Sequence, residues 1–570
     1  MLQHIRRNYP DIVLFSLTIA LAFCLGQLIV KNPGMSMTRW MLALTPAGAI
    51  GIAIVLSRIG IPLGFSGWSS WSLSSSTESR WAFLLCIALA LAAGFCVLVN
   101  PLDPLSGIFV VVSFCVLFAS LCLVAEGRFV DSVGLFFLSL PFLPYIEYKI
   151  EEWHPELGYE WMSFKAMFLL IFAATWFASH SFVRKKPLPR GKVEALLLTL
   201  AAWTLLTAFF STDFAYSMRK WVPEILCPVT VFFIVLSAPR KEGDIHRILS
   251  FLVLSVCVGM MLTLYYYAKY GGSSSSLSGV QRLSVGFMDG KLLANTLLLT
   301  LPVGVGLLST SKARLLRLSL LGFLGIGIMS LLLTWARMVQ ACTCLGAIAF
   351  GFKRGARWLA YVAAIAGVLF VVSNFRILEV LSERYSGMGS VEGVIYASTM
   401  VKRYAGWRAS LKMVRERPIR GIGIGRFREE YGRHESLFYF KWASGYVPLN
   451  SAHNLYLTYL AETGIPGALL LLMMIVLLLR AGFRISRQPR DDTALRFSLL
   501  VSLSLFLCNS LTDGITFSFV GEIDKGLVFW TLMALLVAYD KMDLARQRMH
   551  RQGSIDRPER IECSRSEDFS

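Results

Sequence analysis

Residues 464–480 read GIPGALLLLMMIVLLLR, an almost unbroken apolar run that ends at an arginine. A bilayer core requires about 20 apolar residues per helix, and runs of this kind recur through most of the 570 residues. Hydrophobic residues make up 55% of the chain and charged residues 16%, and the runs lack the alternation of β-barrel strands. The sequence therefore predicts an all-α, polytopic transmembrane helix bundle.

The apolar runs predict about sixteen spans, within a range of roughly 12–16. Pro141 and Pro144 make the span at 131–146 short or broken. The approximate limits are 12–30, 40–57, 81–99, 107–125, 131–146, 164–181, 193–211, 222–238, 249–268, 291–309, 318–336, 338–352, 358–373, 464–480, 497–512 and 524–540.

These spans divide the chain into two groups of helices, at 1–192 and 193–373, followed by a long loop and a final group at 464–540. The loop covers residues 374–463 and contains a predicted amphipathic helix at 398–417. Residues 541–570 are charged and lack an apolar face, so we predict a disordered tail there.

Orientation follows from lysine and arginine, which favour cytoplasmic loops. Alternate short loops, such as 184–192 and 480–496, are rich in these residues, which predicts cytoplasmic termini and a periplasmic loop at 374–463. The net charge of +19 is largely explained by this bias, so nucleic-acid binding is not expected. The predicted periplasmic loop nevertheless carries a surplus of arginine, which suits an anionic lipid or a lipid-linked phosphate.

A histidine stands just before the span at 464–480, in Ser451-Ala-His453-Asn454. A histidine near a membrane surface can accept a proton at neutral pH, whereas the simpler interpretation is a Ser/Asn helix cap with an incidental histidine. Arg337 interrupts the apolar run from 318 to 352, and burial in hydrocarbon would cost it about 2.5–3.5 kcal/mol. It is either a functional arginine or one that extends to the interface.

A reaction that releases a lipid-linked diphosphate would use arginine and histidine side chains. Arginine pairs bidentately with phosphate oxygens and stabilises a diphosphate leaving group, while a neutral histidine accepts a proton from a sugar hydroxyl. The cysteines and histidines form no recognisable metal-binding pattern, so we expect metal-independent chemistry without a cofactor.

The motifs resemble those of the O-antigen ligase and O-antigen polymerase family. They are Arg403-x-x-x-Trp407-Arg408, Arg417-Pro418, Gly421-Ile-Gly423, Ser451-x-His453-Asn454-x-Tyr456-Leu457 and Glu462-x-Gly464-x-x-Gly467. The resemblance covers roughly residues 200–540, and its specific part lies between 403 and 467. Asp289, Lys291 and Ala336 depart from the family pattern, which uses asparagines and a serine there.

The resemblance implies roles for particular residues. His453 would activate the acceptor hydroxyl, and Arg337 with Arg403 or Arg408 would hold the donor diphosphate. The expected binding residues for the diphosphate and glycan are Arg219, Lys220, Arg282, Arg426, Glu462 and Asn454.

The expected function is glycosyl transfer at the periplasmic face of a bacterial inner membrane. The donor would be an undecaprenyl-diphosphate-linked glycan, and the acceptor a lipopolysaccharide core in O-antigen ligation. Polymerisation of O-antigen or exopolysaccharide uses the same donor and remains an alternative. A lipid-linked glycan flippase is a further alternative from a different class, although transporters usually place ionisable residues near the membrane midplane.

Overall fold

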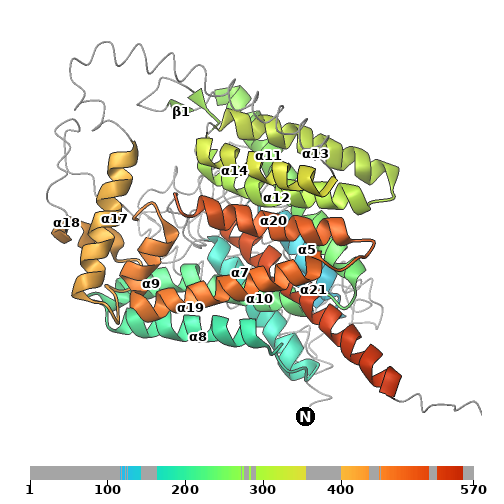
Figure 1. The fold of residues 1–570 in the computed structure, drawn as a ribbon, viewed down its shortest axis with the longest axis horizontal. Helices are drawn as coiled ribbons and strands as arrows, with labels where there is room; N and C mark the ends of the chain where they lie inside the picture. The colour runs from blue at the N-terminus through green and yellow to red at the C-terminus, as the bar shows by residue number, and fades with distance from the viewer. Residues whose placement is uncertain are drawn as a thin grey trace, which may run out of the picture.

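The fold is known from a computed structural model (Figure 1). It describes residues 116, 119–121, 123–124, 126–142, 164–270, 273–274, 281–283, 290–334, 336–354, 399–434, 449, 451–512 and 523–555. The predicted spans at 12–30, 40–57, 81–99 and 358–373 lie outside the described residues, as does most of the span at 107–125.

The described part of the chain is almost entirely helical. Two π-helical segments, Ala178–Val183 and Val222–Leu226, extend neighbouring helices, and the two-residue strands β1 (Ser273–Ser274) and β2 (Gln281–Arg282) pair antiparallel. The α-helices are α5 (Phe129–Ser139), α7 (Phe164–Phe177), α8 (Lys192–Phe209), α9 (Phe214–Trp221), α10 (Cys227–Ser237), α11 (Glu242–Tyr270), α12 (Gly290–Thr310), α13 (Arg314–Leu333), α14 (Arg337–Arg354), α17 (Thr399–Glu416), α18 (Phe427–His434), α19 (Leu455–Ser486), α20 (Thr493–Asn509) and α21 (Ile523–Ile555).

Six helical segments of the described residues are long and apolar enough to cross a membrane, judged by length and composition. The predicted helical membrane class is thereby confirmed for this part of the chain. Each predicted span from 164–181 to 338–352, and each from 464–480 onward, coincides with an observed helix. The six candidates are Lys192–Phe209, Phe214–Ser237, Glu242–Lys269, Gly290–Thr310, Arg314–Leu333 and Leu455–Ser486.

The long helices run side by side and give the bundle two distinct ends (Figure 1). At one end, Asn509 in the last turn of α20 donates a 2.7 Å hydrogen bond to Asn295 near the start of α12. At the other end, Gly306 of α12 lies against Ser498 in the first turns of α20. We refer to these as the His453 end and the Arg496 end, after the residues described below.

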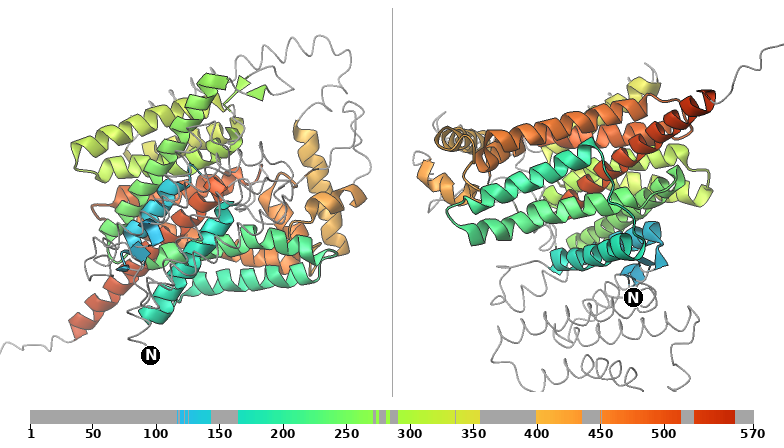
Figure 2. Two further views of the ribbon diagram at one scale, coloured as in Figure 1. Left: turned by 180° about the vertical axis from the view of Figure 1, so that it is seen from behind. Right: turned by 90° about the horizontal axis from the view of Figure 1, so that it is seen from below.

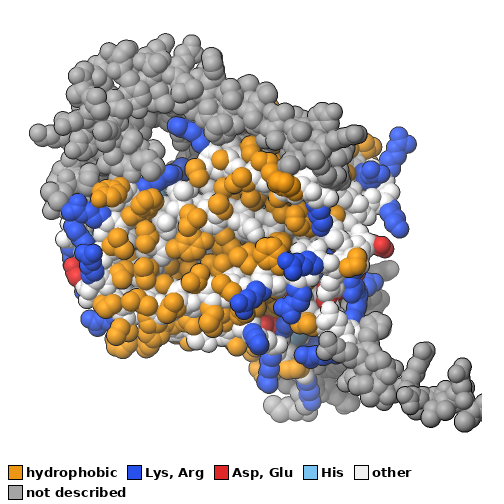
Figure 3. All heavy atoms as spheres, in the orientation of Figure 1, with side chains coloured by type: hydrophobic (Ala, Val, Ile, Leu, Met, Phe, Trp, Pro, Cys, Tyr) orange, Lys and Arg blue, Asp and Glu red, His pale blue; other side chains and the backbone are white. Residues whose placement is uncertain are grey.

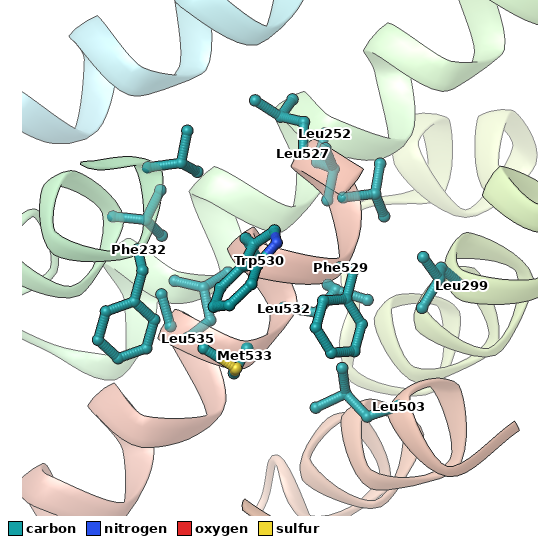
Figure 4. Packing of buried hydrophobic residues seen from close by; sticks show 14 of the residues in the cluster. Phe232, Leu252, Leu299, Leu503, Leu527, Phe529, Trp530, Leu532, Met533 and Leu535 are labelled. Carbon is teal, nitrogen blue, oxygen red and sulfur yellow. The ribbon is translucent and has the colours of Figure 1, made fainter. Parts of the chain in front are cut away.

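The core lies where α10, α11, α12, α20 and α21 meet. Phe529 and Trp530 of α21 project between Phe232, Leu299 and Leu503 from three other helices (Figure 4). All of these side chains are buried. The face of the bundle seen in Figure 3 is broadly apolar, as expected of a surface that contacts lipid.

The long helix α21 corrects one prediction from the sequence. Residues 541–555 were expected to belong to a disordered tail, but they continue α21. Their charges are compensated by distant partners: Lys541 forms an ion pair with Glu194, and Arg546 with Glu242. These ion pairs favour the helical continuation of α21, because charges that are paired within the protein no longer favour a solvated coil.

A buried ion-pair network marks the Arg496 end. The Arg496 side chain is fully buried and contacts Asp492 at 2.7 Å, Glu242 at 2.9 Å and Asp543. The network therefore joins the first turns of α11 and α20 to the middle of α21. Removing one member of such a network leaves the others buried without compensation.

Candidate active site

The segment around His453 is attached to the end of α20. The backbone N–H of Leu455 donates to the Ser510 carbonyl at 3.0 Å, and the Asn454 side chain donates to the Leu511 carbonyl at 2.9 Å. Asn454 also caps α19, because its side-chain oxygen accepts from the Leu457 N–H at 3.0 Å. The helix start is thus fixed on both sides.

His453 itself has an unusual backbone conformation, with φ +49°. A non-glycine residue in this region carries strain of order 1–3 kcal/mol, and such residues cluster at functional sites. Its half-buried side chain lies at the start of α19. The strain is maintained by the hydrogen bonds that hold Asn454 and Leu455 on α20.

Arg337 lies at the same end of the bundle as His453. It is exposed and begins α14, which packs antiparallel to α20: Cys342 of α14 lies beside Cys508, and Phe350 meets Phe497 with ring centroids 5.3 Å apart. The start of α14 therefore lies at the level where α20 ends. An N-terminal helix position also favours anions, because the helix dipole adds to the arginine charge.

The Arg282 backbone adjoins this region. Leu283, the next residue, donates its backbone N–H to the Leu333 carbonyl at 3.0 Å, in the last turn of α13. The turn from α13 to α14 follows directly and leads to Arg337. Arg282, Arg337 and His453 thus come from three separate parts of the chain to the His453 end.

Helix α17 crosses this end of the bundle at a steep angle to α8 and α19 (Figures 1 and 2). Gly406 of α17 packs on Ala452, where an added Cβ would lie 3.0 Å from the Ala452 Cα. Half-buried Arg403 lies one turn before this contact, whereas exposed Arg408 lies about 200° further round the helix. Of the two loop arginines, Arg403 therefore has the position closer to the His453 segment.

A glycine-rich loop after α17 inserts into a break in α19. Gly464 has φ +70° and interrupts the helix. At this break, the backbone carbonyls of Ala461 and Glu462 accept hydrogen bonds from the N–H groups of Ile422 and Gly423, both at 3.0 Å. A Cβ at Gly421 would collide with the Glu462 carbonyl, so this close backbone approach requires glycine.

Glu462 lies beneath this loop and is 6% exposed. Its carboxyl group accepts a 3.3 Å hydrogen bond from the Phe427 N–H and a second from the Gly425 backbone. Lys220 and Glu224 of the neighbouring segment lie close enough to interact with it electrostatically. The Glu462 side chain is directed at the protein backbone.

Arg426 is also committed to the protein. Its side chain is 7% exposed, donates to the Thr212 hydroxyl at 2.9 Å, and forms ion pairs with Glu429 and, at 3.7 Å, with Asp213. The Arg426 guanidinium and the Lys220 ammonium both lie over the Tyr216 ring, at 5.7 and 5.8 Å from its centroid. These contacts attach the glycine-rich loop to α9.

Residues 297–472 match the family model described as O-antigen ligase. We refer to this stretch, which is similar to the O-antigen ligase family, as the O-antigen ligase domain. No curated protein matches the chain. The family match supports a membrane glycosyltransferase of the O-antigen ligase and polymerase type.

The O-antigen ligase domain begins in α12 and ends in α19, so it contains Arg337, Arg403, Arg408, His453 and the glycine-rich loop. Arg219, Lys220 and Arg282 precede it in sequence. Lys220 nevertheless lies against the domain, because a Cβ added at Gly425 would be 2.5 Å from its side chain.

Within the O-antigen ligase domain and its neighbours, the expected site residues form two groups. His453 and Asn454 lie with Arg337 and the Arg282 backbone at the end of α20, with α17 packed alongside. Lys220, Arg426 and Glu462 lie around the glycine-rich loop, and Arg219 is the neighbour of Lys220 on α9. The two groups are separated by the first seven residues of α19, 455–461, or about 11 Å along the helix.

Sequence reasoning missed two residues of the second group. Trp203 of α8 donates its indole N–H to the Thr463 carbonyl at 2.9 Å, and Glu224 interacts with Glu462. A carboxylate within the apolar run after Trp221 was the available signal for Glu224. Nothing in the local sequence distinguishes Trp203 from other span tryptophans.

Proposed function

We propose that the protein transfers a glycan from an undecaprenyl-diphosphate-linked donor to an acceptor hydroxyl, and that O-antigen ligation to a lipopolysaccharide core is the reaction. The observation that carries the proposal is the O-antigen ligase match over a domain that holds a strained histidine and Arg337 at one end of the bundle. A histidine and arginines are the groups that this chemistry requires.

In the proposed reaction, the acceptor hydroxyl gives its proton to the His453 imidazole. The hydroxyl oxygen then forms a bond to the anomeric carbon of the donor, and the bond from that carbon to the diphosphate oxygen breaks. Arg337, together with Arg403, stabilises the negative charge that develops on the departing undecaprenyl diphosphate. The glycosyl–diphosphate bond supplies the driving force, so no nucleotide is needed.

The distribution of charge supports a periplasmic active site. Lysine and arginine are concentrated in the connections at the Arg496 end. Two ion pairs place helix starts at this end: Lys541 with Glu194 in the first turn of α8, and Arg490, just before α20, with Glu242 at the start of α11. Positive residues favour the cytoplasmic side, so the opposite, His453 end faces the periplasm in this proposal. The donor would reach it from the outer leaflet.

Polymerisation is the second candidate, because the family includes enzymes of both types and the same donor and base serve both reactions. The two differ in the acceptor, which is a lipid-anchored core in ligation and a growing glycan in polymerisation. A flippase would require no new glycosidic bond. The cations of the His453 group lie at one end of the bundle rather than along its middle, which favours chemistry over transport.

The test is glycosyl transfer in proteoliposomes that contain a polyprenyl-diphosphate glycan and either lipopolysaccharide core or free repeat units. His453→Ala and Arg337→Ala should each lower the rate by about 10²-fold or more. His434→Gln and Arg433→Ala are the matched controls, because both residues belong to α18, where Arg433 pairs with Glu430 and His434 pairs with Glu416 at the end of α17. Full activity in the folded His453→Ala variant would refute the mechanism.

A further inference from the structure

The part of α19 that follows the break at Gly464 has an exposed apolar side. Beyond Gly464, one side of α19 packs into the bundle and the other exposes a stripe of large apolar side chains, Ile465, Leu469, Leu472 and Met473, each between 45% and 59% exposed. Such a stripe on a membrane span faces the acyl chains of the lipids. Ile465 is its member closest to the His453 end.

The stripe continues into the turn after α17. The Ile465 N–H donates to the Pro418 carbonyl at 2.8 Å, which places the next residue, Ile419, beside the top of the stripe. Ile419 is 68% exposed, although it belongs to a polar connection. An exposed isoleucine at this level is stable if it contacts the outermost part of the acyl chains.

Basic side chains surround this apolar extension. Arg415, in the last turn of α17, and Arg420 are both exposed, and Leu411 lies on the same side of α17 one turn before Arg415. The nearby carboxylate of Glu416 is already paired with His434 at 2.9 Å. Lysine and arginine side chains accordingly form a margin beside the apolar face in the space-filling view (Figure 3).

We propose that Leu411, Arg415, Ile419, Arg420 and Ile465, which we term the corner surface, bind the headgroup of an anionic phospholipid of the surrounding bilayer. The two guanidinium groups pair with the phosphate, and Ile419 and Ile465 contact the upper acyl chains. A helix that lies across the bundle, with apolar and basic residues on one side, has the composition of an interfacial helix.

The geometry favours a bilayer lipid over the glycan donor. Arg415 lies nine residues from Gly406, about 180° round α17 from the contact with Ala452 beside His453. A phosphate held by Arg415 is therefore on the outer side of α17. Bound lipid would fix the height of α17 in the membrane and, through the Gly406–Ala452 contact, the position of Arg403.

The experiment uses the full chain with the photoreactive residue p-benzoylphenylalanine in place of Ile419, in nanodiscs of phosphatidylcholine and phosphatidylglycerol in equal amounts. Irradiation should attach phosphatidylglycerol in clear excess over phosphatidylcholine, as measured by mass spectrometry. Combining this with Arg415→Gln and Arg420→Gln should reduce the excess about fivefold for each arginine. Arg428→Gln with Arg433→Gln, exposed on α18, should leave it unchanged.

Native mass spectrometry of the chain without the photoreactive residue gives a second reading, in which Arg415→Gln/Arg420→Gln should lose phosphatidylglycerol retained by the wild type. Equal attachment of the two lipids, or unchanged retention in the double variant, would overturn the proposal. With the polyprenyl-diphosphate glycan added to the nanodiscs, attachment of this donor in place of phosphatidylglycerol would overturn the proposal and assign the surface to the substrate. His453→Ala, which should lower glycosyl transfer, should leave the excess of attached phosphatidylglycerol unchanged, so the proposed function and the lipid proposal can fail separately.

Discussion

Replacing Glu462 tests whether the glycine-rich loop is held in place by a buried carboxyl group. In Glu462→Ala, the backbone N–H groups of Phe427 and Gly425 lose their acceptor inside the protein. A buried donor without a partner costs about 1–3 kcal/mol, so two such donors should lower the free energy of unfolding by about 2–6 kcal/mol. Glu462→Gln keeps an acceptor oxygen of the same reach and should lose about 1 kcal/mol or less.

The free energy of unfolding can be measured by SDS titration in mixed micelles, followed by tryptophan fluorescence. Glycosyl transfer is measured on the same preparations, and Glu462→Gln should retain most of the wild-type rate. If Glu462→Ala is as stable as the wild type, the carboxyl group does not support the loop. If Glu462→Gln is as damaging as Glu462→Ala, the charge beside Lys220 and Glu224 matters more than the hydrogen bonds.

Two further predictions concern the break in α19 and the acidic side chain before α20. Gly464→Ala should destabilise the protein by about 2 kcal/mol or more, because φ is +70° and the new Cβ would collide with the Ile419 carbonyl. The control Gly322→Ala, which has open space around it, should not destabilise the protein. Equal midpoints of SDS unfolding for the two variants would contradict this prediction. Burial raises the pKa of Asp492, but the nearby His246 side chain, 4.0 Å away, and the Arg496 guanidinium outweigh it and lower the pKa from 3.8 to about 2. A lowered pKa contributes stability that is present above pH 3.8 and is lost as the pH falls toward 2. The midpoint of thermal unfolding of the wild type should therefore fall steeply in this pH range, and that of Asp492→Asn should not. Parallel plots of midpoint against pH for the two proteins would refute the lowered pKa of Asp492.

The membrane class and most span positions follow from the sequence, because a run such as 464–480 has few stable alternatives to a buried helix. The N-cap at Asn454 was also predictable, since it depends on local chemistry. The similarity to the O-antigen ligase family was predictable as well, because the motifs that carry it are short and contiguous.

The contacts between motifs were not predictable. Arg426 and Glu462 belong to motifs beside His453 in the sequence and were expected to bind substrate, yet the structure directs both at the protein. Whether a side chain contacts substrate or backbone depends on how α19 breaks and on what fills the break. Likewise, the helix at 541–555 depends on partners such as Glu242, about three hundred residues away.

Helix α20 is anchored at both ends, by Arg496 at one and by the Leu455–Ser510 hydrogen bond at the other. A rocking motion of the bundle would have to break a buried ion pair, which costs about 3–5 kcal/mol when its charges are left uncompensated. Helix α20 is therefore held rigidly at both of its ends. Under the proposed function, the substrates would therefore reach His453 by diffusion in the membrane, and the scaffold around His453 would keep its shape during the reaction.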